Sequence, residues 1–298
     1  MSDLPLDQVR TLLAVVDEQS FDRAAAVLHV TPSAVSQRVK ALEQRMGRVL
    51  ILRTKPVRLT ESGQVLVRFA RQLTRLEADT RAELGLADSG PTTLPIAVNA
   101  DSLATWFLPA LAAVPPEPAI CFDLRSDDQD HTATLLREGL VMAAVTSAPH
   151  PVQGCTATRL GRMRYRAVAA PAFVSRWLAD RPLRQALPAA PVILFDRKDD
   201  LQDRFVRSLT RRPATGGVRH YVPSSESFGD AVAAGLGWGM VPELQLSARP
   251  RHAAPLVDLA PDRPADVPLY WQQWKLDSPA LATVAEAVAK AAGEVLRS

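Results

Sequence analysis

The sequence predicts an α/β protein with an all-α N-terminal part and a bilobed α/β C-terminal part. Three observations predict it. Short amphipathic helical segments separated by turns fill residues 6–46, and a longer amphipathic segment follows at residues 61–84. Beyond a break near residues 89–93, apolar runs alternate with helical patterns. A chain of 298 residues, 47% of them hydrophobic, is long enough to give each part its own core.

Two short helices joined by a tight turn are predicted near the N-terminus, after a first helix from about Leu6 to Glu18. Ser20 can cap the first of the two by accepting a hydrogen bond from a free backbone N–H. Thr31 can cap the second, with Pro32 in its first turn, where the missing backbone donor costs little. This is the arrangement that a DNA-reading helix-turn-helix needs.

The helix after Thr31 has one apolar and one polar face. Four apolar residues at spacings of four, three and four hold it onto its neighbours: Val35, Val39, Leu42 and Met46. The opposite face carries Ser33, Ser36, Gln37 and Lys40. Short hydrogen-bonding groups followed by a cation suit base edges and phosphates in a major groove. For this helix alone, an ordinary solvated face remains the alternative.

A short β-ribbon with a basic tip is predicted after Gly47, from the apolar residues 49–52 and the segment behind them. Its tip carries Arg53, Lys55 and Arg58. Such a wing would touch the phosphate backbone beside the reading helix. Between Thr31 and Arg75, ten basic residues stand against two acidic ones, while the whole chain has a net charge of only +3. This local excess suggests a polyanionic partner for one region of the chain.

Thr60 can cap a long helix over residues 61–84. A single apolar stripe recurs every three or four residues along it and includes Val65, Phe69, Leu73 and Leu76. A stripe of this kind on an otherwise charged helix requires a partner helix, so it predicts a dimer. An ordinary core helix is the alternative.

The order of these motifs resembles the N-terminal winged helix-turn-helix of LysR-type transcriptional regulators. The motifs that carry the resemblance, within residues 4–63, are SFxxAAxxL, TPSAVSQRVKALE and RLTxxG. It implies a DNA-binding homodimer that assembles into a homotetramer, with double-stranded promoter DNA as partner and a C-terminal domain that senses a small molecule. The expected DNA contacts are Thr31, Pro32, Ser33, Ser36, Gln37, Lys40, Arg53, Lys55 and Arg58.

We expect three divisions of the chain: a winged helix-turn-helix at 1–60, a linker helix for dimerisation at 61–90 and an effector-binding domain at 91–298. Strand and helix patterns divide the last into two α/β lobes with a parallel-rich sheet, about 91–162 plus 267–298 and about 163–266. The resemblance implies a fold of the periplasmic-binding-protein type. Two lobes with a chain that crosses back produce a ligand cleft at the strand ends.

Polar residues at the expected strand ends are the candidates for this cleft. The first lobe offers Asn99, Asp101, Ser102 and Thr146, and the second offers Asp196, Ser225 and Glu226. Hydroxyls and helix N-termini suit the carboxylate of an amino acid, and the acids suit its ammonium groups. For each acid taken singly, a helix cap or a solvated surface position is an equally good explanation.

A narrower resemblance covers almost the whole chain. The segments AVNADSLATWFLP, FDRKDDLQDRF and VPSSESFGDAVAAGLGWGMVPE are similar to the ArgP/LysG branch of the family, which responds to lysine and arginine. It implies L-lysine or L-arginine as effector, control and probable activation of a basic amino acid exporter gene, and RNA polymerase as a partner if the protein is an activator. It also carries Asp128 as an effector contact, beside Asn99, Asp101, Ser102 and Glu226. A different small-molecule effector is the alternative.

Other classes of function have little support in the sequence. The five histidines stand in neither HxxxH nor HExxH order, and no nucleophile elbow or phosphate loop is present, so we expect no enzyme, metal or cofactor. A purely architectural DNA binder would not need some two hundred residues of sensor domain. Isolated cysteines, an acidic N-terminus and no apolar stretch of ~20 residues predict a cytoplasmic protein without a membrane partner.

Overall fold

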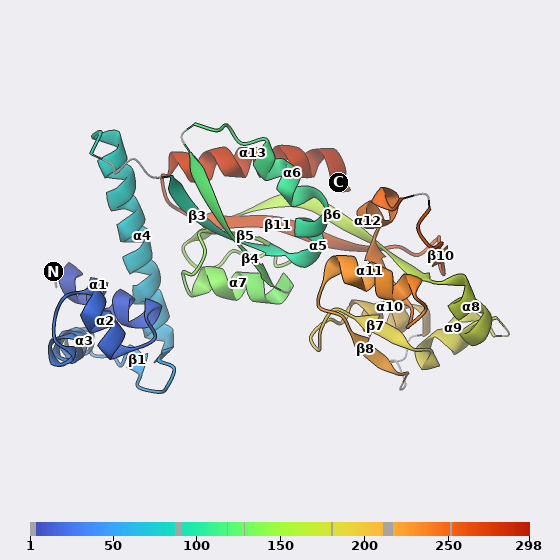
Figure 1. The fold of residues 1–298 in the computed structure, drawn as a ribbon, viewed down its shortest axis with the longest axis horizontal. Coiled ribbons are helices and arrows are strands. Elements are labelled where there is room, and N and C mark those ends of the chain that lie inside the picture. The colour runs from blue at the N-terminus through green and yellow to red at the C-terminus, as the bar shows by residue number, and fades with distance from the viewer. Residues whose placement is uncertain are drawn as a thin grey trace.

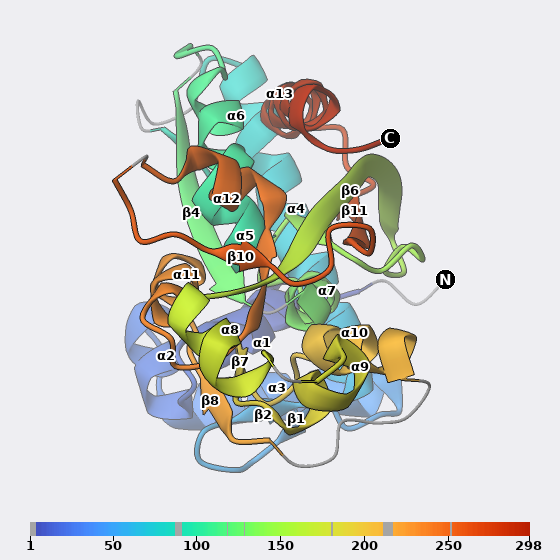
Figure 2. The same ribbon diagram turned by 90° about the vertical axis from the view of Figure 1, so that its right-hand side faces the viewer.

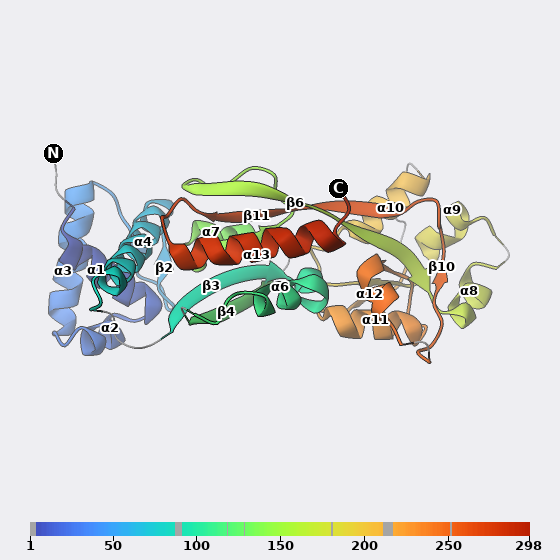
Figure 3. The same cartoon turned by 90° about the horizontal axis from the view of Figure 1, so that it is seen from above.

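The computed structural model describes residues 4–86, 91–117, 119–127, 129–179, 181–210, 217–250 and 252–298. The N-terminal helices, the long helix α4 and two α/β lobes follow one another along the molecule (Figure 1). Seen from above, the same order gives an elongated chain with the N-terminal helices at one end and the second lobe at the other (Figure 3). Of the expected linker, Ser89 and Gly90 lie outside the described residues.

The predicted helix-turn-helix is present as α1 (Leu6–Asp17), α2 (Phe21–Val27) and α3 (Pro32–Met46). The side chain of Ser20 accepts a hydrogen bond from the N–H of Arg23 at 3.4 Å, and that of Thr31 accepts one from Ala34 at 3.2 Å. Both predicted caps are therefore confirmed. Gly47 ends α3 in the left-handed conformation with φ of 63°, which favours glycine.

The predicted wing is an antiparallel ribbon of β1 (Ile51–Leu52) and β2 (Arg58–Leu59). Glu43 fixes its start to α3, because one carboxylate oxygen accepts the N–H of Leu50 at 2.8 Å. Helix α4 (Glu61–Glu83) then passes so close to the ribbon that a Cβ on Gly63 would lie 2.1 Å from the carbonyl oxygen of Leu50. Only glycine allows this approach.

Helix α4 has three faces with different surroundings, whereas the sequence predicts a single apolar stripe. One face packs into the core of the helix-turn-helix through Leu66, Val67 and Ala70. A second face turns toward the first α/β lobe, where Arg71 donates a 2.8 Å hydrogen bond to the carbonyl of Gly139. The third face leaves apolar side chains exposed, namely Val65, Leu76 and Leu84.

A seven-stranded sheet runs through the C-terminal part in the order β10-β6-β11-β5-β3-β4, with β9 paired to β6. Its strands are β3 (Thr92–Asn99), β4 (Ile120–Asp127), β5 (Ala143–Thr146), β6 (Cys155–Ala169), β9 (Gly239–Pro242), β10 (Val257–Asp258) and β11 (Ala265–Trp274). Strand β3 runs parallel to β4 and β5, whereas β6 and β11 are antiparallel to their neighbours. In this sheet the expectation of parallel pairing is therefore met only by β3 with β4 and β3 with β5.

Strands β6 and β11 are long because each passes from one lobe into the other (Figures 1 and 2). Their pairing shifts register between Leu269 and Tyr270, opposite Gly161, whose φ is 142°. The C-terminal segment joins them there, since the backbones of Arg162 and Arg297 exchange hydrogen bonds of 2.7 and 3.0 Å. The two lobes are thus connected by a pair of continuous strands, with an irregularity in the pairing.

Helices cover the sheet of the first lobe. They are α5 (Ala100–Ser102), which continues through a π-helical turn (Leu103–Phe107) into α6 (Leu108–Ala112), then α7 (Gln129–Arg137) and α13 (Pro279–Val295). Among the core side chains, the rings of Phe107 and Trp271 stack with centroids 6.4 Å apart.

The second lobe has a small parallel pair of strands, β7 (Val192–Leu194) and β8 (Arg219–Tyr221). Its helices are α8 (Pro171–Trp177), α9 (Leu183–Ala186), α10 (Leu201–Thr210), α11 (Ser225–Ala233) and α12 (Glu243–Ala248). The buried rings of Phe205 and Trp238 lie with their centroids 5.9 Å apart and pack α10 against the residue that precedes β9. Among the described helices, none combines the length and apolar character that crossing a bilayer requires.

Candidate functional site

The polar face of α3 points away from the core of the helix-turn-helix. Val35, Val39 and Leu42 are buried on its inner side. On the opposite side, the predicted DNA-contacting residues are exposed: Thr31, Pro32, Ser33, Gln37 and Lys40. Ser36 on the same side is half-buried. The structure therefore presents these side chains together on one accessible helix face, as a groove-reading helix requires.

The wing is held against that same helix by Arg53. Its Nη1 donates a 3.3 Å hydrogen bond to the hydroxyl of Ser36, and its guanidinium carbon lies 5.4 Å from the centroid of the Phe21 ring. Lys55 is exposed at the tip. Arg58 is exposed and also lines a hollow between the wing and the first α/β lobe. The three predicted wing cations are thus all exposed but have different surroundings.

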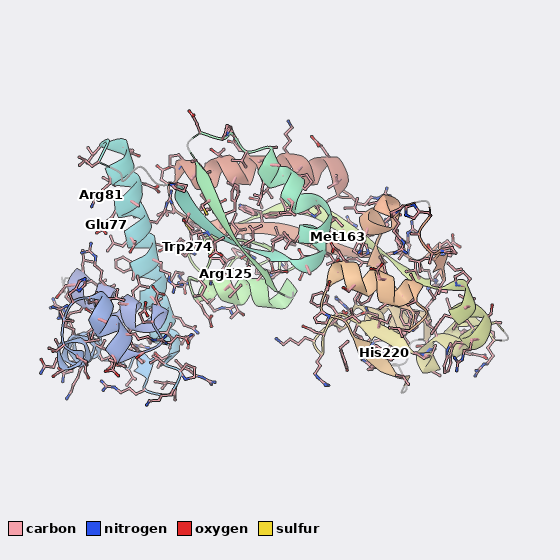
Figure 4. The ribbon with its side chains drawn as sticks, viewed as in Figure 1. Glu77, Arg81, Arg125, Met163, His220 and Trp274 are labelled. Carbon is pink, nitrogen blue, oxygen red and sulfur yellow. The ribbon has the colours of Figure 1, made fainter. Side chains whose placement is uncertain are left out.

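A cavity of about 710 Å³ lies at the junction of the two lobes, beside the crossing strands β6 and β11. Figure 4 labels Met163 where β6 passes between the lobes. Three of the sequence-predicted effector residues line the cavity: Asn99, Asp101 and Ser225. Further lining residues that the sequence did not single out include Tyr165, Asp199, Gln202 and Gln245.

Asp101 is the acid at the centre of this site. Its Oδ1 accepts a 2.6 Å hydrogen bond from the hydroxyl of Ser225, and its Oδ2 accepts one of 2.7 Å from the hydroxyl of Tyr165. Burial raises the pKa of Asp101, although these two hydrogen bonds act in the opposite direction. A cation placed beside this carboxyl would restore its ionised form.

Asp199 is a second, partly buried acid in the lining, and it comes from the second lobe. Its two oxygens accept the backbone N–H groups of Phe195 at 2.8 Å and Leu201 at 3.1 Å. Burial raises the pKa of Asp199, the hydrogen bonds oppose the rise, and the charge of Asp101 adds to it. Two carboxyl groups in the lining of one cavity favour a cationic ligand.

Several buried amide groups in the lining have no hydrogen-bond partner within the described part of the chain. They are both side-chain polar atoms of Asn99, Oε1 of Gln202 and Oε1 of Gln245. Buried polar groups are normally paired, so such a cluster suggests a site completed by water or a polar ligand. The set offers donors as well as acceptors.

The other predicted effector residues lie elsewhere. Ser102 and Thr146 are fully buried and do not contribute to the lining, because their side chains face the interior of the first lobe. Asp196 is turned back onto its own loop, where Oδ1 accepts the N–H groups of the second and third residues after it. Glu226 is exposed on α11, outside the lining. Asp128 lies outside the described residues.

A third feature joins the two parts of the chain. Arg71 pairs with Asp17 of α1 and also donates to the carbonyl of Gly139, at the end of the turn that follows α7. The close packing leaves no room at Gly139, where an added Cβ would lie 2.9 Å from Cα of Arg68. Arg125 and Trp274 lie at the end of the first lobe that faces α4 (Figure 4).

Comparison with known proteins covers both parts. Residues 6–64 match the family described as bacterial regulatory helix-turn-helix protein, lysR family, and residues 88–293 match the LysR substrate binding domain. The lysine export transcriptional regulatory protein LysG of Corynebacterium glutamicum is 46% identical over 292 residues, which cover 97% of this chain and 98% of that protein.

Two solved structures are similar over almost their full length. The crystal structure of ArgP from Mycobacterium tuberculosis has a TM-score of 0.88 and 47% identity, covering 97% of this chain and 98% of that one. The full-length LTTR LysG of Corynebacterium glutamicum with bound effector Arg has a TM-score of 0.82 and 43% identity, covering 98% and 99%. This chain therefore belongs to the LysR family of bacterial helix-turn-helix regulators.

Proposed function

We propose that this protein is a cytoplasmic transcriptional regulator that binds promoter DNA and responds to L-lysine or L-arginine. One observation carries the effector part of the proposal. The cavity between the lobes is lined by two partly buried acids, Asp101 and Asp199, and neither forms an ion pair with a described lysine or arginine. A buried carboxylate without a counter-ion is costly, and a cationic ligand offsets that cost.

The DNA contacts are proposed to come from α3 and the wing. The exposed face of α3, with Ser33, Gln37 and Lys40, is suited to base edges and phosphates, whereas Lys55 at the wing tip is suited to the backbone alone. Arg53 joins the two elements, so the wing and the helix meet DNA as one surface. Thr31, Pro32, Ser36 and Arg58 complete the proposed interface.

The effector contacts are proposed to be Asn99, Asp101 and Ser225, together with lining residues that the structure adds. Relatives support a basic amino acid: one similar structure holds Arg as effector, and a similar protein is named for lysine export. We extend this to control of an exporter gene for basic amino acids. As an activator, the protein would also contact RNA polymerase. Its role would be one of binding, with no reaction catalysed.

A homodimer is proposed through the third face of α4. Val65 and Leu76 are 50% and 42% exposed on a helix whose other two faces are already covered within the chain. Paired helices would bury these side chains and place two reading helices for two half-sites of one operator. Further pairing between sensor domains would give the tetramer.

Calorimetry on the full-length protein tests the effector assignment. We expect saturable binding of L-arginine or L-lysine and none of L-glutamate, because the cavity acids repel an anionic side chain. Asp101→Asn should weaken binding by about thirtyfold or more, as loss of one partner of a buried charge pair does. If neither basic amino acid binds, or another class of small molecule binds instead, the assignment is overturned while DNA binding remains a separate question.

A further inference from the structure

The cavity presents different chemistry at its two acids. Around Asp101 the neighbours are polar and come from both lobes: Asn99 and Ser147 from the first lobe, Ser225 and Gln245 from the second. The segment that carries Asp199 contributes both apolar residues, Phe195, Leu201 and Phe205, and charged residues, Lys198, Asp200 and Arg204, to the lining. Its apolar members can pack against the hydrocarbon stem of a ligand, and Asp199 can meet a charge at the tip of that stem.

The Asp199 carboxylate is also held in a fixed position. Two backbone N–H groups donate to it, one to each oxygen, so its oxygens cannot rotate away from the cavity without losing these bonds. Each oxygen accepts one backbone bond and retains a lone pair for a second donor. A place in the lining and a fixed orientation are what a charge-selecting residue needs.

The other acids in this region either lie outside the lining or already pair with a cation. Oδ1 of Asp196 accepts hydrogen bonds from two N–H groups of its own loop, and Asp196 lies outside the lining. Asp200 is 63% exposed and pairs with Arg204 at 2.9 Å. Glu226 is exposed on α11. Asp199 is the acid of the second lobe that combines partial burial, a place in the lining and no ion pair with a described lysine or arginine.

We propose that Asp199 pairs with the side-chain cation of the bound amino acid and so selects basic over neutral effectors, while Asp101 pairs with the α-ammonium group. This inference rests on the proposed function, because it assigns the two cationic groups of lysine or arginine to the two acids. It makes Asp199 a specificity-determining residue, and Asp101 a residue that any L-amino acid would use. A ligand without a side-chain cation then loses the Asp199 interaction alone.

Matched neutral ligands test the assignment by calorimetry on the full-length protein. L-citrulline has the shape of L-arginine without the charge, and L-norleucine replaces L-lysine. We expect the wild type to prefer arginine over citrulline by about thirtyfold or more. In Asp199→Asn this preference should fall to within about threefold, while the control Glu226→Gln, which removes one exposed charge nearby, should keep it.

A second variant keeps the test decisive if Asp199→Asn does not fold. Asp199→Glu retains the charge but extends the carboxylate by one methylene, so the best ligand should become shorter by one methylene. We expect the preference for lysine over ornithine to reverse in Asp199→Glu and to remain in Glu226→Asp. A residue with a merely structural role would not change the preferred chain length.

The outcomes separate the two levels of proposal. If the wild type binds neither arginine nor lysine, the proposed function fails. If it binds them, and Asp199→Asn keeps the arginine preference or Asp199→Glu keeps the lysine preference, the role of Asp199 is overturned while the proposed function stands.

Discussion

The hydroxyl of Ser225 donates a 2.6 Å hydrogen bond to Oδ1 of Asp101, across 124 residues of sequence. Asp101 belongs to the first lobe and Ser225 begins α11 of the second. Tyr165, on the strand that crosses between the lobes, donates to the other oxygen of the same carboxyl. A cation that binds Asp101 thus acts on one of the groups through which the lobes touch, so occupancy and lobe position are physically connected.

Ser225→Ala should weaken arginine binding by roughly five- to tenfold. The Ser225 hydroxyl lowers the pKa of Asp101, so its loss favours the protonated form that binds no cation, at a cost of about 1 kcal/mol for one hydrogen bond. Calorimetry on Ser225→Ala measures this. The control is Ser227→Ala, an exposed position on the same helix. Equal effects from both substitutions would contradict a specific role for the cross-lobe bond.

Arginine binding should become tighter as the pH rises. Burial raises the pKa of Asp101 and Asp199 above their unfolded values, so both groups favour folding below the unfolded pKa, and this contribution is lost as the pH rises through the folded pKa. A ligand cation stabilises the ionised carboxylates and lowers both pKa values, so binding releases protons. Calorimetry in two buffers with different ionisation enthalpies measures that release. An affinity and proton count that stay constant with pH would rule out titration of these acids on binding.

The two DNA-contacting elements should respond differently to substitution. Lys55→Ala should weaken binding to all duplexes and reduce the slope of log K against log salt by about 0.9, because one phosphate contact is lost. Gln37→Ala should leave the slope unchanged and cost about 1–3 kcal/mol of discrimination at one base pair. Fluorescence anisotropy on operator and mismatched duplexes distinguishes them. Substitution of Arg53 would not isolate a phosphate contact, because its guanidinium also donates to Ser36 and lies over the Phe21 ring. Identical behaviour of the two variants would disprove the division of roles.

The sequence predicts best what depends on near neighbours. Thr31 bonds the N–H three residues ahead, and Thr60 bonds the N–H of Gly63 in the same way, so the spacing of residue types already contains both helix starts. The polar face of α3 follows similarly from the positions of Val35 and Val39. Each of these features needs only one turn of helix to be correct.

The ligand site depends on choices that sequence spacing leaves open. In α11 the sequence offers Ser225 and Glu226 as neighbours, and helix rotation places only one of them toward the cavity. Ser225 lies three residues before Phe228 and seven before Val232, both buried, so the helical period would have favoured it over Glu226. No such signal separates Asp196 from Asp199, because the loop folds back on itself through backbone hydrogen bonds.

Contacts between distant segments are the part that sequence reasoning missed altogether. In the sequence of α4, three apolar residues fall outside the predicted apolar stripe: Leu66, Val67 and Ala70. In the structure they pack against the helix-turn-helix. Arg71 reads as a surface charge, yet it pairs with Asp17 and Gly139 in two different parts of the chain. Such faces emerge only when separate elements dock, and no local pattern specifies the docking.

Gly63→Ala should destabilise the N-terminal domain by more than about 2 kcal/mol. The added methyl would overlap the Leu50 carbonyl at 2.1 Å, and that atom is backbone and cannot swing aside. Gly293→Ala is the matched control, since nothing lies within 4 Å and the position is inside α13, where alanine is favoured by up to about 1 kcal/mol. Chemical denaturation monitored by circular dichroism compares the two. A Gly63→Ala protein as stable as wild type would show that α4 does not approach the wing this closely.

Leu76→Arg should dissociate the proposed dimer. Leu76 is 42% exposed on the uncovered face of α4, whereas Phe69 on the same stripe also packs against the helix-turn-helix core and would confuse folding with assembly. A charge in a helix pair that buries this face should raise the dimer dissociation constant by about thirtyfold or more. The control is Val218→Arg, which adds the same charge at a 59% exposed position in the second lobe. Sedimentation velocity should show monomers for Leu76→Arg and wild-type assembly for Val218→Arg. A Leu76→Arg protein that remains dimeric would place the contact on another surface.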